Sequence, residues 1–78
     1  MSQRNPVHPV LRALGRNVRR RRELLNFTQA ILSEKSDIDQ TYLSGIECGK
    51  RNPGIKNIAR IAKALETTIS QLVEGVGE

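Results

Sequence analysis

The segment 40–48, QTYLSGIEC, carries short polar side chains that can exchange hydrogen bonds with a partner surface. If the segment is helical, Leu43, Ile46 and Glu47 share one stripe, because residues three and four apart lie on the same face. The opposite face then carries small or polar residues, namely Thr41, Ser44, Gly45 and Cys48. Such groups suit recognition by contact rather than catalysis. The chain has no serine, histidine and acid grouping and no metal-ligand spacing, so we expect no enzyme, no metal and no cofactor.

This polar face has the chemistry that the major groove of DNA requires, and that groove is wide enough for an α-helix. Gln40 can bond adenine bidentately, Thr41 offers a hydroxyl and a methyl group, and Ser44 is short enough for the groove floor. Tyr42, on the flank, can reach a phosphate or the edge of a thymine. Gly45 lowers helix stability by about 1 kcal/mol relative to alanine, so we expect something to approach the backbone closely there. The alternative is a polar face that contacts only solvent.

Two charges fall on helical stripes that should be buried. Glu47 lies on the inner stripe of this segment, and Arg22 continues the apolar stripe of Leu11, Leu14 and Val18. An isolated charge in an apolar interior is strongly unfavourable, so it is tolerated only when it is paired and hydrogen-bonded. We therefore predict that Arg22 and Glu47 pair bidentately and join the first helix to the third. In the alternative, one or both side chains reach solvent instead.

Short helices must position these residues. Apolar spacing and capping residues predict five of them, with the first from about Pro9 to Leu25. The second helix is capped by Thr28 and runs to about Ser36, and the third is capped by Asp39 and runs to Cys48. The fourth contains Ile55, Ile58, Ala62 and Leu65. The fifth is capped by Thr68 and contains Ile69, Leu72, Val73 and Val76. No alternating pattern predicts a strand. We expect an all-α fold, with residues 1–8 as a flexible arm and 9–76 as one domain.

Bulk composition restricts the class of partner. The chain has 78 residues and a net charge of +5, which favours an anionic partner such as nucleic acid or a membrane surface. Seven arginines and no acid lie between Met1 and Arg22, so one end carries the positive field. The single cysteine excludes an internal disulfide and predicts a reducing, cytoplasmic location. No long apolar run is present, so we expect no membrane span.

The order of motifs gives a family resemblance. The stretch FTQAILSEKSDIDQTYLSGIECGKRNPGIKNIARIAKALETTISQLV resembles the Cro/cI-type (XRE family) helix-turn-helix domains of phage repressors. It is most similar to the small controller proteins of restriction-modification systems, which share the run TYLSGIE.GKRN. The resemblance implies a five-helix, lambda-repressor-like domain with the helix-turn-helix at its second and third helices. It also implies a transcriptional regulator, bacterial or phage-encoded, that binds double-stranded DNA.

The resemblance also assigns roles to residues. Gln29 matches a phosphate-gripping residue that often braces the residue at the place of Gln40. The positions that match base-reading, backbone or loop contacts in the family are Gln40, Thr41, Tyr42, Ser44, Lys50, Arg51 and Asn52. Arg51 matches either a phosphate contact or a groove contact, and Arg22 and Glu47 match a buried family ion pair. Controllers often have an arginine where this chain has Gln40, so the operator sequence does not transfer.

A monomer of this size reads few base pairs, so we expect a twofold dimer on a pseudo-palindromic operator. Ile69, Val73 and Val76 add more apolar surface than one small core absorbs, so we expect them to form the dimer contact with part of the fourth helix. Glu34 and Asp37 lie where related repressors touch RNA polymerase, which is a further candidate partner. The alternatives are a phage-type repressor, the antitoxin of a toxin-antitoxin pair, or, in a different class, a protein-binding adaptor.

Overall fold

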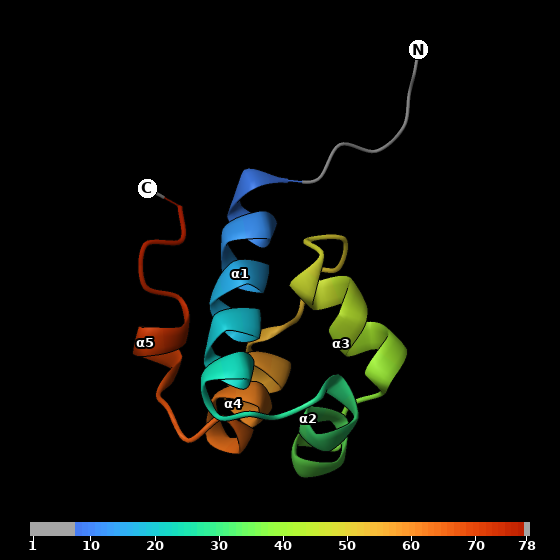
Figure 1. Cartoon of the computed structure of the whole chain (residues 1–78). Helices are drawn as coiled ribbons and strands as arrows, with labels where there is room; N and C mark the ends of the chain where they lie inside the picture. Colours follow the sequence, from blue (N-terminus) through green and yellow to red (C-terminus); the bar gives the residue numbers. More distant parts are fainter. Residues whose placement is uncertain (1–7, 78) are drawn as a thin grey trace.

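Five helices make up the fold of the protein (Figure 1). The computed structural model describes residues 8–77, and no strand occurs within that range. The helices are α1 (Pro9–Leu24), α2 (Gln29–Ser36), α3 (Gln40–Glu47), α4 (Ile55–Ala64) and α5 (Ile69–Leu72). The all-α class is therefore confirmed. The proposed arm lies outside the described residues except for His8, whose Nδ1 accepts a hydrogen bond from the backbone N–H of Val10 at 3.2 Å.

Side-chain caps begin α2, α3 and α5 at the expected residues. The Thr28 hydroxyl accepts a hydrogen bond from the N–H of Ile31, and the Thr68 hydroxyl accepts one from the N–H of Gln71. The Asp39 carboxylate accepts two, from the first turn of α3. The corner between α2 and α3 contains Asp37 with φ 59° and ψ 38°, a left-handed conformation that aspartate tolerates better than most residues. Local sequence signals thus fix where these helices begin.

The last helix is shorter than its apolar spacing predicts. We expected Val73 and Val76 to lie within it, but α5 ends at Leu72 and Val73 is its C-terminal cap. The chain then continues in turns, with Gly75 and Gly77 at φ 77° and φ 92°. Positive φ values are incompatible with a continuing right-handed helix. The prediction for this segment was therefore wrong in its extent.

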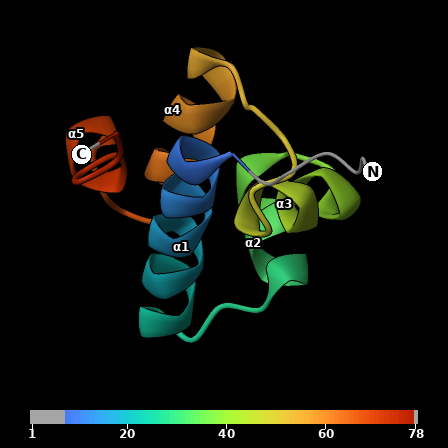
Figure 2. The same ribbon diagram turned by 90° about the horizontal axis from the view of Figure 1, so that it is seen from above.

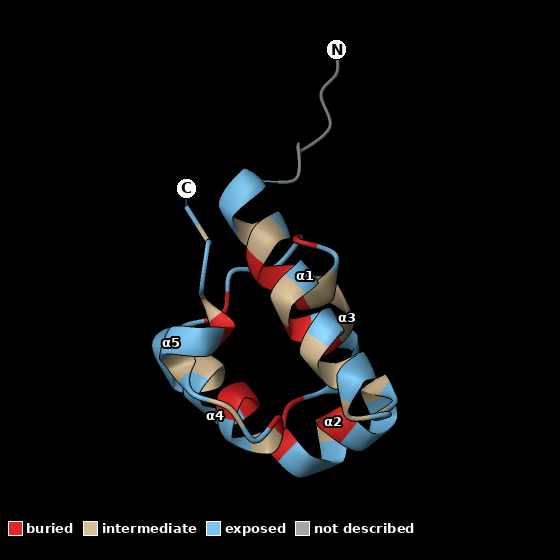
Figure 3. Ribbon diagram, turned by 60° about the vertical axis from the view of Figure 1, so that its left-hand side comes forward, coloured by how far each residue is buried: buried red, intermediate tan, exposed pale blue. Residues whose placement is uncertain are grey.

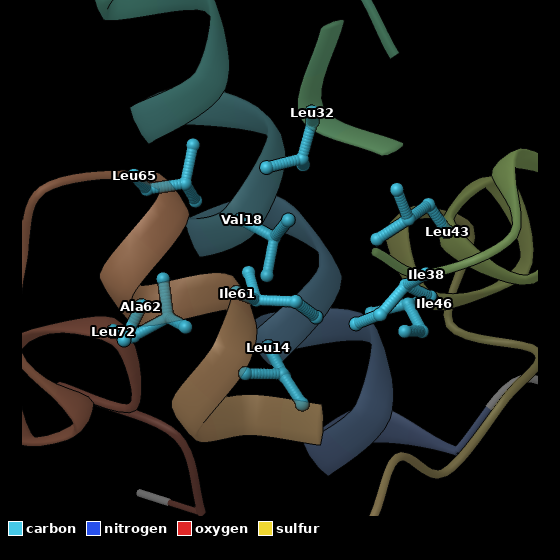
Figure 4. Close-up of a cluster of buried hydrophobic side chains, with 10 residues drawn as sticks. All are labelled: Leu14, Val18, Leu32, Ile38, Leu43, Ile46, Ile61, Ala62, Leu65 and Leu72. Atoms are coloured by element: carbon cyan, nitrogen blue, oxygen red, sulfur yellow. The ribbon is translucent and has the colours of Figure 1, made fainter. Parts of the chain in front are cut away.

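The core draws on every helix (Figure 4). Its ten buried apolar residues are Leu14, Val18, Leu32, Ile38, Leu43, Ile46, Ile61, Ala62, Leu65 and Leu72. In two views, α1 stands between α3 and α5, and α4 packs behind it (Figures 1 and 2). Buried residues lie on the inner sides of the helices, and exposed residues cover their outer sides (Figure 3). This arrangement leaves one face of α3 directed away from the core.

Gly15 allows α1 and the end of α3 to cross closely. A Cβ atom at this position would lie 2.5 Å from the backbone oxygens of both Ile46 and Glu47, closer than real Cβ atoms come to other atoms. Only glycine fits without a backbone shift. Because Arg22 lies two turns further along the same side of α1, the close crossing also brings its side chain within reach of Glu47.

Candidate nucleic-acid interface

The helix α3 presents opposite faces to the core and to solvent, as its sequence predicts. Leu43 and Ile46 are fully buried. The outer face of α3, which consists of Gln40, Thr41, Ser44, Gly45 and Cys48, is exposed or half-buried. The Asp39 carboxylate bonds the N–H groups of Thr41 and Tyr42 at 3.0 and 3.3 Å and so fixes the first turn. The structure thus holds a short polar surface at a defined orientation.

The inner side of α3 is anchored by the predicted ion pair. Arg22 Nε donates to Glu47 Oε2 at 2.7 Å, and Arg22 Nη2 donates to Glu47 Oε1 at 3.0 Å. The two side chains are 12% and 4% exposed, so both charges are largely removed from water. The remaining donor Nη1 bonds the backbone oxygen of Phe27 at 2.8 Å. Hydrogen bonding to Glu47 raises the pKa of Arg22 above its ordinary value, against the opposing effect of burial.

Gln29 joins this anchor from α2. Its Nε2 donates to Glu47 Oε1 at 3.0 Å, so α1, α2 and α3 meet at one carboxylate. The family resemblance implied instead that Gln29 braces Gln40. An ionised carboxylate is a stronger acceptor than a neutral amide, which accounts for the partner that Gln29 takes here. One hydrogen of its amide group remains available at the beginning of α2.

The loop after α3 returns to the helix that it follows. The N–H of Lys50 donates to the backbone oxygen of Gly45 at 2.8 Å, and Gly49 has φ 77°. Lys50, Arg51 and Asn52 are exposed, and Arg51 lies beside the outer face of α3. We expected something to approach the backbone closely at Gly45, and the group that does so is the side chain of Arg51. A Cβ atom on Gly45 would be 2.5 Å from Arg51 Cγ.

The run of four arginines in α1 serves several separate purposes. Arg19 pairs with Glu23 on the surface, with 63% and 56% of the two side chains exposed. Arg21 donates to the backbone oxygens of Leu65 and Glu66, both at 2.9 Å, and so closes the end of α4. Arg12, Arg16 and Arg20 remain exposed. Arg21 and Arg22 therefore bond within the fold, whereas most of the basic charge of the described part of α1 faces solvent, as predicted for this end of the molecule.

Two polar residues of α1 were missed because they act at a distance in sequence. Asn17 Nδ2 donates to the backbone oxygens of Leu72 and Glu74 at 2.8 and 2.9 Å, which closes the end of α5. Arg21 does the same for α4. Both lie next to the apolar stripe of α1, and that position was the only available signal. Within residues 8–77, no group of three or more potential ligands could hold a metal ion.

Comparison with known proteins connects this geometry to a family. The sequence pattern of the family described as helix-turn-helix matches residues 18–72, which include α2, the corner and α3. The chain belongs to the helix-turn-helix family. It is thus a DNA-binding regulator of transcription and not an enzyme, and the predicted function class is confirmed. None of the helices in the described range is long and apolar enough to cross a membrane.

Several relatives of this helix-turn-helix protein are control proteins. It is 36% identical over 56 residues to control protein C.MunI of a Mycoplasma species, a match that covers 72% of this chain and 76% of C.MunI. It is 34% identical over 64 residues to control protein C.SmaI of Serratia marcescens, covering 82% and 76% of the two chains. The crystal structure of the restriction-modification controller protein C.AhdI from Aeromonas hydrophila superimposes with a TM-score of 0.82 at 31% identity, covering 83% of this chain and 98% of C.AhdI.

Proposed function

We propose that the protein is a controller of restriction-modification genes that binds a pseudo-palindromic operator as a dimer. The observation that carries this proposal is the outer face of α3, which is polar outside and anchored inside by Arg22 and Glu47. The similarity to the restriction-modification controller protein C.AhdI supports the assignment of restriction-modification genes as the regulated genes. The proposed site of action of this bacterial or phage-encoded protein is the bacterial cytoplasm, on the nucleoid.

The proposed roles follow from position on the DNA-facing side. Gln40, Thr41 and Ser44 contact base edges in the major groove, since they occupy the exposed first turns of α3. Residues at the margins, which lie at the beginning of α2 and in the loop after α3, contact the phosphate backbone or the groove edge. These residues are Gln29, Tyr42, Lys50, Arg51 and Asn52. Phosphate contacts fix the register, and base contacts specify the sequence.

The proposed dimer surface contains the end of the chain and part of α4. Ile69, Val73 and Val76 pack against the core but remain only partly buried. Ile55 at the beginning of α4 is 64% exposed. Half-covered apolar side chains favour burial against a second copy. A twofold dimer would also present two α3 helices to the two halves of the operator.

RNA polymerase is a further proposed partner. Glu34 and Asp37 are exposed at the end of α2 and at the corner that precedes α3. An acidic surface at the edge of a DNA-binding helix can contact basic residues of a protein on the adjacent DNA. Recruitment of polymerase would make the protein an activator at one operator position and a repressor at another.

Operator binding can be tested by fluorescence anisotropy with the DNA upstream of the gene and a scrambled duplex. A protein that makes roughly 6–10 phosphate contacts should lose about 10³–10⁵ in affinity between about 50 and 200 mM salt, while its preference for the native duplex remains. Gln40→Ala should relax base choice at one position, and Lys50→Ala should weaken binding equally on all sequences. Equal, salt-insensitive binding of both duplexes would contradict the proposal.

A further inference from the structure

The largest hollow on the described part of the chain lies between the second half of α1 and the segment 67–74, which contains α5. Its volume is about 720 Å³, and no residue of α3 lines it. In Figures 1 and 2, α3 and α5 lie on opposite sides of α1. Pockets for small organic molecules have volumes of about 300–1,000 Å³. This α1–α5 hollow is therefore large enough for a small molecule and separate from the surface proposed to contact DNA.

The α1 wall of the hollow combines positive charge with an apolar side chain. Its residues are spaced three and four apart and so share one side of the helix, namely Asn17, Arg20, Arg21 and Leu24. Arg20 is exposed and forms no ion pair within residues 8–77. Arg21 uses Nε and Nη2 for two backbone oxygens at the end of α4, and its Nη1 has no hydrogen-bond partner among those residues. Leu24 is 68% exposed, so a bound molecule could cover it.

The segment 67–74 supplies a further donor to the hollow. The Thr67 hydroxyl donates to Gln71 Oε1 at 2.7 Å, and both residues line the hollow. Because Oε1 is the acceptor in this bond, the Nε2 hydrogens of Gln71 are available to a ligand. Leu72, which is 2% exposed, adds apolar surface to the same wall. The hollow thus offers hydrogen-bond donors beside apolar carbon.

The charge balance of the lining favours an anion. Two carboxylates line the hollow, and Glu23 already pairs with Arg19 at 3.1 Å. Glu74 is exposed and forms no ion pair within residues 8–77, so it opposes one of the two lining arginines. One positive charge remains in excess, and clefts with an excess of one charge attract ligands of the opposite sign.

We propose that the α1–α5 hollow binds a small carboxylate that carries an apolar tail. Arg20, Nη1 of Arg21 and Nε2 of Gln71 donate to the carboxylate, since hydrogen bonds between guanidinium groups and carboxylates are strong and often bidentate. Leu24 and Leu72 cover the tail, which removes apolar surface from water. This ligand site goes beyond the proposed operator binding and does not depend on it.

A ligand in the hollow would also adjoin the contact that holds the end of the chain. Asn17 lines the hollow, and its Nδ2 bonds the backbone oxygens of Leu72 and Glu74. Val73 and Val76 of the proposed dimer surface lie on either side of Glu74 in the sequence. A ligand that stabilises this contact and a second copy that binds the same segment should favour each other. This step alone rests on the proposed dimer.

The probe is octanoate, titrated into the full chain and followed by proton–nitrogen NMR. Saturable shifts should appear at the amide groups of residues 17–24 and 67–74, while the amide groups of α3 should not move. Octanamide has the same tail without the charge, and acetate has the charge without the tail. Each should bind at least about tenfold more weakly than octanoate.

Substitutions of exposed residues test the two halves of the site without disturbing the core. Arg20→Gln should weaken octanoate binding about tenfold, and Leu24→Ala about fivefold. Arg16→Gln is the matched control, because Arg16 is also an exposed arginine of α1 but does not line the hollow. Glu74→Gln should strengthen binding, since it removes the opposing charge. Weaker binding by Glu74→Gln would mean that the ligand needs a cationic group and would overturn the proposed class.

Absence of saturable shifts would overturn the site itself. If Leu24→Ala then weakened the dimer, a second copy rather than a small molecule would fill the hollow. Equal shifts in the wild type, Arg20→Gln and Arg16→Gln would indicate general attraction to a basic protein and would also overturn it. Sedimentation with and without octanoate tests the coupling, which a tighter dimer would support and unchanged association would contradict. None of these measurements contains DNA, so failure of operator binding is detected separately.

Discussion

Removal of one partner of the Arg22–Glu47 pair should destabilise the protein far more than removal of both. Glu47→Ala leaves a guanidinium that is 12% exposed without its counter-charge and removes the acceptor of Gln29. Breaking a buried pair in this way costs about 3–5 kcal/mol. A domain of 78 residues has roughly 4–12 kcal/mol of total stability at about 0.05–0.15 kcal/mol per residue. Glu47→Ala should therefore consume a large part of the free energy of unfolding.

The double variant Arg22→Met/Glu47→Leu should recover at least half of that loss. Both charges are then absent, and side chains of similar volume fill the space, although the backbone oxygen of Phe27 loses its donor. Urea unfolding followed by circular dichroism measures the difference, at one protein concentration, because the proposed dimerisation would make apparent stability depend on concentration.

The surface pair of Arg19 and Glu23 provides the matched control. More than half of each side chain is exposed, so Glu23→Ala should change stability by only about 0.2–1 kcal/mol. If Glu47→Ala were no more destabilising than Glu23→Ala, the inner pair would not act as a buried one. If the double variant were as unstable as Glu47→Ala, the cost would come from packing rather than from an unpaired charge.

Three further predictions concern the other contacts of α1 and the proposed dimer. Gly15→Ala should destabilise by about 1–3 kcal/mol, because the methyl group meets two backbone oxygens. Gly54→Ala should cost less, about 0.5 kcal/mol, because its methyl group meets no atom within 4 Å and the only loss is a better N-cap residue of α4; thermal unfolding compares the two variants. Asn17→Ala removes both hydrogen bonds at the end of α5, so amide exchange should rise first in the last helix, and uniform acceleration throughout the chain would argue against a local clamp. Val73→Asp should sediment as a monomer at concentrations where the wild type is dimeric; unchanged sedimentation would rule this residue out of the dimer surface.

Local signals in the sequence were sufficient for most of the helix boundaries. Thr28, Asp39 and Thr68 were predicted as caps because a capping side chain bonds backbone groups only two or three residues away. The Arg22–Glu47 contact could also be predicted, although the two residues are 25 apart. When each of two helices carries one charge on its buried stripe, few other groups are available to pair with either charge. That prediction rested on the energetic cost of an unpaired buried charge and not on closeness in the sequence.

Contacts that no buried charge requires could not be predicted from the sequence. Asn17 and Arg21 bond backbone oxygens 44 to 57 residues away, and any polar side chain beside an apolar stripe could equally face solvent. Gly45 was correctly interpreted as a crowded position, but the nearby group is Arg51 of the same chain. A glycine in the middle of a helix indicates that another group lies close to the backbone there, but it does not identify that group. The apolar spacing of Val73 and Val76 predicted helix where glycines turn the chain.

The length of α3 determines how freely its outer face can vary. Eight residues are too few for a stable isolated helix, so tertiary contacts hold α3 in place. Those contacts lie at Leu43, Ile46 and Glu47, and the cap Asp39 fixes the first turn locally. None of these interactions involves the side chains of Gln40 or Thr41, which are exposed. Gln40→Arg should therefore leave the free energy of unfolding in urea unchanged within about 0.5 kcal/mol while it changes the selected operator sequence. If stability and base choice changed together, the side chains of the outer face of α3 would contribute to the stability of the fold. The buried side of α3 and its outer face would then not be independent of each other.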